Sequence, residues 1–206
     1  MVDLLIYERG QLRFGGKKAE MPVSEGIEIR GELSTFSVTR WQKWAASRTG
    51  LNNNSGTIYN LVNKIDLHLE ELELIGNRIH HVKIMAKRGP AMWIATVNGN
   101  ELKGRFRIPH IANDTTPLIA QLSVLKLVET EEDRKSEVPD PRKMPSLRIE
   151  SKEFYYNGIY HGRLIIAATR VTKGLRFDTV NMTSKYASIK AKGIWKHQNG
   201  KQLSKF

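Results

Sequence analysis

The stretch "SIKAKGIW" at residues 188–195 decides the fold class, because its side chains alternate between two kinds. Ile189 and Ala191 fall on one side of the chain, and Lys190 and Lys192 fall on the other. Successive side chains of a β-strand point to opposite faces, so the pattern predicts a strand with one apolar and one cationic face. The open question is what the apolar face covers.

Similar alternation runs through most of the chain. The clearest alternating runs lie at 27–33, 65–74, 81–86, 102–108, 147–151, 162–168 and 174–180. They are short, and turn residues separate them, as in "YNG" at 156–158 and "TKG" at 172–174. Short alternating runs between turns predict a mainly β protein with a curved, elongated antiparallel sheet.

One segment breaks this alternation. The stretch "SVTRWQKWAASRTG" at 37–50 places Val38, Trp41 and Ala45 at the spacing of one helix face. It predicts a single short amphipathic helix near 37–48, which the tryptophans would anchor onto the sheet.

A charged segment with three prolines, at 129–145, divides the chain. Its composition predicts a linker or long loop. We therefore expect a first β unit at 1–128, which contains the helix, and a second β unit at 146–206 that is cut short. Such units would stack to bury a continuous face, and the chain would be a piece of a longer repetitive protein.

The two units share residue patterns. Leu67 in the first unit matches Leu147 in the second, and Ile84 matches Leu164. Each unit is expected to hold several strands in the same order, so that together they form one repeated architecture.

Composition limits the classes of function. The chain has 206 residues, a formal net charge of +12 and no cysteine, which excludes disulfides and thiolate metal sites. The positive charge suggests an anionic partner, but the cations are spread along many strands, as on a solvated strand face. No apolar stretch approaches the ~18 residues of a membrane span, so this segment is expected to be soluble by itself.

Catalytic and metal-binding patterns are absent from the sequence. It has no nucleophile elbow, zinc-protease motif, phosphate-binding loop or dinucleotide fingerprint. His80 and His81 are adjacent in a predicted strand, so their rings would point to opposite faces and could not share a metal. We therefore expect no enzymatic activity, no cofactor and no metal site.

The apolar face is the remaining candidate site. Either a second sheet closes over it, as in a sandwich, or a curved sheet leaves it open as a groove. Periodicity by itself favours the closed core. An open groove would suit acyl chains, because each methylene removed from water is worth about 0.8 kcal/mol. The candidate lining residues are Leu67, Leu69, Ile84, Leu102, Phe106, Leu147, Ile149, Leu164, Ile166, Leu175, Phe177 and Ile189.

Two other functions stay open on the residues. The basic-aromatic stretch "GRFRIP" at 104–109 could contact nucleic acid, and the basic tail after residue 190 could bind phosphates weakly. Both signals are nonspecific, so no specific nucleic acid is expected. The alternatives to lipid binding are a basic β-rich nucleic-acid-binding module and a structural spacer without a ligand.

The order of many weak motifs resembles that of a known family. The stretch at 144–195 resembles AsmA-like bacterial envelope proteins of the YhdP type, and the resemblance extends from about Gly26 to the end of the chain. The family's unit contains a Pro-x-Leu strand, a G-x-x-x-G segment, a G-L-x-I/F segment and a closing G-x-W. The matching residues here are Pro145 with Leu147, Gly158 with Gly162, Gly174 to Phe177, and Gly193 to Trp195. The stretches "GELSTFSVTRWQKW" at 31–44 and "MWIATVNGNELKGRFRIP" at 92–109 resemble the family's helix entry and tryptophan strand.

This resemblance implies a segment, from the C-terminal region, of a bridge-like lipid transfer protein. Such proteins are anchored in the inner membrane and carry phospholipid across the periplasm along an apolar β groove, which supports the outer-membrane barrier. The resemblance makes the open groove the favoured alternative, with phospholipid acyl chains as the partner. Membrane attachment would come from parts of the protein outside this chain.

Overall fold

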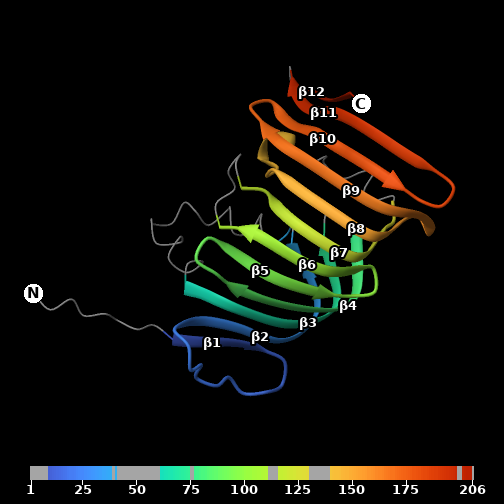
Figure 1. Cartoon of the computed structure of the whole chain (residues 1–206). Coiled ribbons are helices and arrows are strands. Elements are labelled where there is room, and N and C mark those ends of the chain that lie inside the picture. Colours follow the sequence, from blue (N-terminus) through green and yellow to red (C-terminus); the bar gives the residue numbers. More distant parts are fainter. Residues whose placement is uncertain are drawn as a thin grey trace, which may run out of the picture.

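A computed structural model describes residues 9–38, 40, 61–74, 77–110, 116–129, 140–198 and 201–205. In this part of the chain, twelve strands form one sheet in which the spatial order follows the sequence (Figure 1). The strands are β1 (Arg9–Phe14), β2 (Gly26–Ser37), β3 (Val62–Leu74), β4 (Asn77–Arg88), β5 (Met92–Asn98), β6 (Leu102–Pro109), β7 (Leu118–Leu127), β8 (Leu147–Tyr156), β9 (Ile159–Val171), β10 (Gly174–Thr183), β11 (Ser188–Gln198) and β12 (Lys201–Lys205). The prediction of a mainly β, elongated sheet is confirmed.

Strand orientation departs from the prediction at three places. Hairpins join β3 through β7 and β8 through β12 in antiparallel order. The pairs β1–β2, β2–β3 and β7–β8 are parallel. A parallel neighbour needs a connection that returns to the same end of the sheet. The segment 128–146, which contains the predicted linker, makes that return between β7 and β8, and the sheet continues across it without a break.

Both turns predicted from short sequence signals are confirmed. β8 ends at Tyr156 and β9 begins at Ile159, so Asn157 and Gly158 form a two-residue turn. Their φ angles are 49° and 78°, as a type I′ hairpin requires. β9 ends at Val171 before the second predicted turn.

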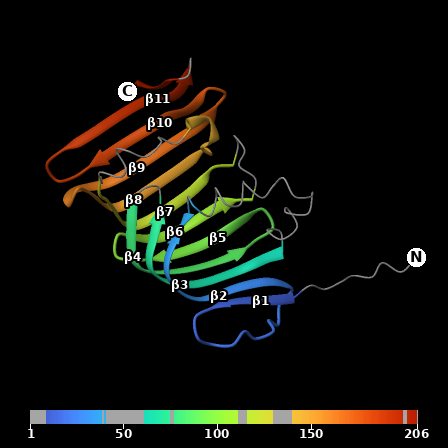
Figure 2. The ribbon, with the colours of Figure 1, turned by 180° about the vertical axis from the view of Figure 1, so that it is seen from behind.

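Several strands bend sharply along their length, as the two opposite views show for β2, β3 and β4 (Figures 1 and 2). From Leu67 to Leu72 in β3 and from Ile79 to Ala86 in β4, buried and half-buried apolar side chains are two residues apart, except for a gap of three between Leu69 and Leu72 and between Ile79 and Val82. These gaps face each other, because Leu69 pairs with Val82 and Leu72 pairs with Ile79. His81 lies in the gap with a φ of 51°. The pleat therefore reverses at this line, and apolar side chains stay on one face beyond the bend.

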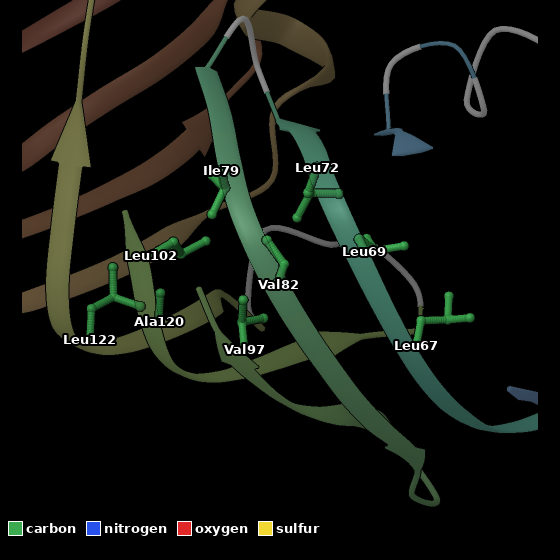
Figure 3. Close-up of a cluster of buried hydrophobic side chains, with 9 residues drawn as sticks. All are labelled: Leu67, Leu69, Leu72, Ile79, Val82, Val97, Leu102, Ala120 and Leu122. Atoms are coloured by element: carbon green, nitrogen blue, oxygen red, sulfur yellow. The ribbon is translucent and has the colours of Figure 1, made fainter. Parts of the chain in front are cut away.

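The buried core lies on this face. Its nine members come from β3 to β7 and are drawn together in Figure 3. They are Leu67, Leu69, Leu72, Ile79, Val82, Val97, Leu102, Ala120 and Leu122. Phe14 of β1, Phe36 of β2 and Ile149 of β8 pack against them, so one cluster extends over eight neighbouring strands.

The predicted helix at 37–48 lies almost entirely outside the described residues, and with it both of its tryptophans. At its start, the Ser37 hydroxyl accepts a hydrogen bond from the backbone N–H of Arg40 at 3.3 Å, as an N-cap does. In the predicted linker, residues 130–139 also lie outside the described part. Pro141–Lys143 forms a 3₁₀ turn, η1, which packs against β10 and β11.

Candidate functional site

Strand register arranges the apolar side chains in continuous rows across the sheet. The first row joins directly paired residues from β1 to β11, namely Leu12, Ile29, Ile65, Ala86, Ala95, Phe106, Ala120, Ile149, Ile166, Val180 and Ala191. The second row lies beside it and contains Phe14, Gly31, Leu67, Ile84, Val97, Gly104, Leu122, Ser151, Leu164, Met182 and Ile189. We call the face that carries both rows the inner face.

Only one position in the two rows carries a polar side chain. Ser151 is completely buried, and its hydroxyl donates a hydrogen bond to the backbone carbonyl of Glu153 at 2.7 Å. A buried hydroxyl that is satisfied locally adds no free polar group to the surface of the row. Both rows are therefore apolar across all of their strands.

All twelve residues predicted to line a groove lie on the inner face. Seven belong to the rows themselves, namely Phe106, Ile149, Ile166, Leu67, Ile84, Leu164 and Ile189. The other five either lie two residues from a row member on the same strand or pair with a residue of the inner face. These are Leu69, Leu102, Leu147, Leu175 and Phe177. Register thus brings the predicted set onto one surface.

The inner face is closed over some strands and open over others. Leu69 is 3% exposed and Val82 is 1% exposed, whereas Ile189 is 49% exposed. Within the described residues there is one sheet, so no second sheet covers the inner face as it would in a sandwich. Burial in β3 and β4 comes in part from the bend, which gathers Leu72 and Ile79 into the same cluster.

Near the C-terminal strands, η1 covers part of the inner face. Pro141 is less than 2% exposed, and Leu175 of β10 is 1% exposed. Asp140 caps η1, since its carboxylate accepts hydrogen bonds from the backbone and the guanidinium of Arg142. The hydrogen bond from the Arg142 side chain holds the pKa of Asp140 well below its usual range. This cap orders the turn that packs against β10 and β11.

Sequence reasoning missed the small residues of the rows. Ala86 and Ala95 lie side by side in the first row, and Ala120 follows on the other side of Phe106. Gly104 is in the second row, and a Cβ there would lie 2.3 Å from the carbonyl oxygen of Gln121. Ala95 follows the alternation of "WIATV" at 93–97, which is enough to identify it as an inner-face residue. It was not singled out because its side chain is small beside the larger apolar residues.

Polar clusters on the described residues are small. The His80 ring lies 3.1 Å from a Glu101 carboxylate oxygen and 3.8 Å from one of Glu71. In the part of the chain that the structure covers, no group of three or more acidic and histidine residues is arranged to hold a metal ion. No helix among the described residues has the length and apolar character of a membrane span. The inner face is therefore the candidate functional site.

The sequence was compared with models of protein families. The model of the family described as "YhdP protein" matches residues 5–206, which include every described strand. Searches of curated proteins and of solved structures gave no match. The family match agrees with the order of weak motifs along the sequence, and the chain belongs to the YhdP family of AsmA-like proteins.

Proposed function

We propose that this chain is a segment of an AsmA-like envelope protein that carries phospholipid between the inner and outer membranes. Membership of the YhdP family supports the envelope and lipid-transport assignment. The observation that carries the proposal is the pair of unbroken apolar rows from β1 to β11 on a sheet that has no second sheet over it in the described residues. Acyl chains would lie on the inner face in the periplasm.

The rows have a suitable length for such a path. Eleven strands spaced about 4.8 Å apart give a track of about 48 Å. One leaflet of a membrane provides about 15 Å of hydrocarbon, so the track exceeds the depth over which one acyl chain extends there. A lipid would therefore find the same apolar surface at each successive strand and could move along it.

The proposed mechanism is passive. Each methylene in contact with the rows gains about 0.8 kcal/mol relative to water, while the headgroup stays hydrated at the rim. Neighbouring strands offer similar contacts, so a step along the rows would change the free energy little. No bond is made or broken, and the proposal involves no catalytic residue, cofactor or metal.

The alternative nucleic-acid function has less support. Phe106 lies in the first row on the inner face, whereas its neighbours Arg105 and Arg107 lie on the opposite face. A base-stacking platform needs aromatic rings and cations on the same surface. A ligand-free spacer remains the competing proposal, and it is favoured by the burial of Leu69 and Val82.

The test compares adjacent positions on opposite faces. Ile189 faces inward and Lys190 faces outward, and both are exposed. A photo-crosslinking amino acid replaces each in turn, and the purified chain is irradiated with labelled phospholipid in high salt. We expect labelling from position 189 and little from position 190. Equal labelling, or none at position 189 together with a lipid-free mass by native mass spectrometry, would favour the spacer.

A further inference from the structure

The opposite side of the sheet, which we call the outer face, carries a basic patch on β4, β5 and β6. Strand register arranges nine residues there in three rows of three. They are Lys83, Met85 and Lys87 on β4, Asn98, Thr96 and Ile94 on β5, and Lys103, Arg105 and Arg107 on β6. At the spacing of paired strands and alternate residues, this grid measures about 10 Å by 14 Å. Five of its nine side chains are cationic, and none is acidic.

Among the described residues, the cations of this patch form no ion pair, and the acidic residue beside them on the outer face is Asp66 of β3, which pairs with Met85 at the edge of the patch. Elsewhere on the outer face, several cations are paired: Arg30 lies 2.7 Å from Glu28, and Arg176 lies 2.7 Å from Asp178. Arg163 likewise pairs with Glu150. The strands β4, β5 and β6 contain no Asp or Glu, so positive charge accumulates on these three strands, with the single carboxylate of Asp66 at their β3 edge.

Two apolar side chains are exposed inside the same patch. Met85 is 46% exposed and Ile94 is 54% exposed. Lys87 pairs directly with Ile94, which in turn pairs with Arg107, while Met85 lies between two lysines on β4. Ile94 thus lies between two cations, and Met85 lies among Lys83, Lys87, Asp66 and Thr96 rather than among other apolar residues. Such a combination is typical of surfaces that rest in the headgroup layer of a membrane, where the cations contact phosphates and the apolar groups enter the acyl boundary.

We propose that this outer-face patch binds the surface of a membrane that contains anionic phospholipids. The charge fits a phosphate-rich plane, and the strand register places all five cations on one face of the sheet. Nucleic acid fits less well, because no aromatic side chain lies in the grid and Met85 and Ile94 offer nothing to a phosphate backbone. The chain would then contribute a membrane contact of its own, in addition to any anchor outside it. The contact uses the face opposite to the proposed lipid path.

The test is sedimentation of the whole 206-residue chain with lipid vesicles. One vesicle contains phosphatidylcholine only, and in the other part of it is replaced by phosphatidylglycerol. We expect binding to the anionic vesicle, weakening as salt rises. The variant Lys87→Glu, Arg105→Glu, Arg107→Glu should reduce the affinity at least about tenfold, since each cation near an anionic surface contributes measurably.

A matched variant separates a local patch from overall charge. Lys17→Glu, Lys18→Glu, Lys185→Glu changes the net charge by the same amount at exposed positions outside the patch. We expect it to keep most of the binding. Met85→Ser with Ile94→Ser keeps all cations and should weaken binding that persists in moderate salt. Circular dichroism confirms that each variant folds.

Two results would overturn the proposal. The first is an equal loss of binding in both charge variants, which would mean that only net charge matters. The second is binding of double-stranded DNA through the patch residues with vesicles left unbound. Neither result bears on crosslinking from position 189, so failure of the membrane contact and failure of the lipid path are distinguishable.

Discussion

The two ends of the inner face differ in packing although they share one sequence pattern. At β3 and β4, Leu69 and Val82 are almost completely buried. At β11, Ile189 lies in the same row as Leu67 and yet is half exposed. Alternation in the sequence is equally clear at both ends. The difference comes from the bend in β2–β4, which brings further apolar side chains against the rows at one end only.

This difference shows that an apolar row can serve as a core or as a lining. At the closed end, side chains contribute to the free energy of unfolding by excluding water together. At the open end, they leave surface that another apolar molecule could cover. The open end is therefore where lipid contact is best tested, and the closed end is where substitutions report on stability.

The largest expected effect is a truncation at the closed end. Leu69→Ala removes a fully buried side chain, and we expect the free energy of unfolding to fall by about 2–5 kcal/mol. Ile189→Ala at the open end should lower it by no more than about 1 kcal/mol. Urea unfolding followed by circular dichroism measures both. Similar losses at the two positions would mean that the inner face is equally closed along its length.

The sequence was sufficient to predict which residues share the inner face. A period of two assigns each side chain to a face whatever the strand's neighbours do, which is why all twelve predicted residues lie together. The same period is compatible with parallel and antiparallel pairing, so it could not reveal the parallel pairs at β2–β3 and β7–β8.

The repeat was harder to place residue by residue. The sequence matched Leu67 with Leu147 and Ile84 with Leu164, but in the sheet Leu67 pairs with Ile84 whereas Leu147 pairs with Ala168. The matched residues are therefore not equivalent in register. The burial of individual side chains could not be predicted either, because it depends on the bend near His81. The alternating pattern of the sequence does not reveal that this histidine has a positive φ angle.

A smaller effect is expected from a glycine of the second row. Gly104→Ala would place a Cβ 2.3 Å from the Gln121 carbonyl oxygen and 2.7 Å from the Leu122 Cα, both of them backbone atoms of β7. Because backbone cannot move aside cheaply, we expect a loss of about 1–3 kcal/mol in urea unfolding. Gly10→Ala is the control, since nothing lies within 4 Å of its added Cβ. A neutral Gly104→Ala would indicate that β6 and β7 can separate.

The smallest effect concerns pH and the side of the C-terminal strands that carries Asp178. Asp178 of β10 accepts a hydrogen bond from the Thr169 hydroxyl at 2.5 Å and another from Arg176 at 2.7 Å. The Thr169 bond, followed by that from Arg176, lowers the pKa of Asp178, against a partial opposing effect of burial. A carboxyl whose folded pKa is depressed stabilises the fold above its unfolded value, about 3.9, and loses that contribution as the pH falls through the folded value.

We therefore expect the melting temperature to decrease between pH 5 and pH 3, and to decrease less in Asp178→Asn. Thr169→Val removes the principal hydrogen bond and should reduce the pH dependence in the same direction while keeping the carboxylate. Thermal unfolding by circular dichroism at each pH measures the change. Because Asp178 is partly exposed, the difference should be small beside that of Leu69→Ala. An unchanged pH dependence in both variants would mean that this pairing of β9 and β10 adds nothing to the stability of the C-terminal strands.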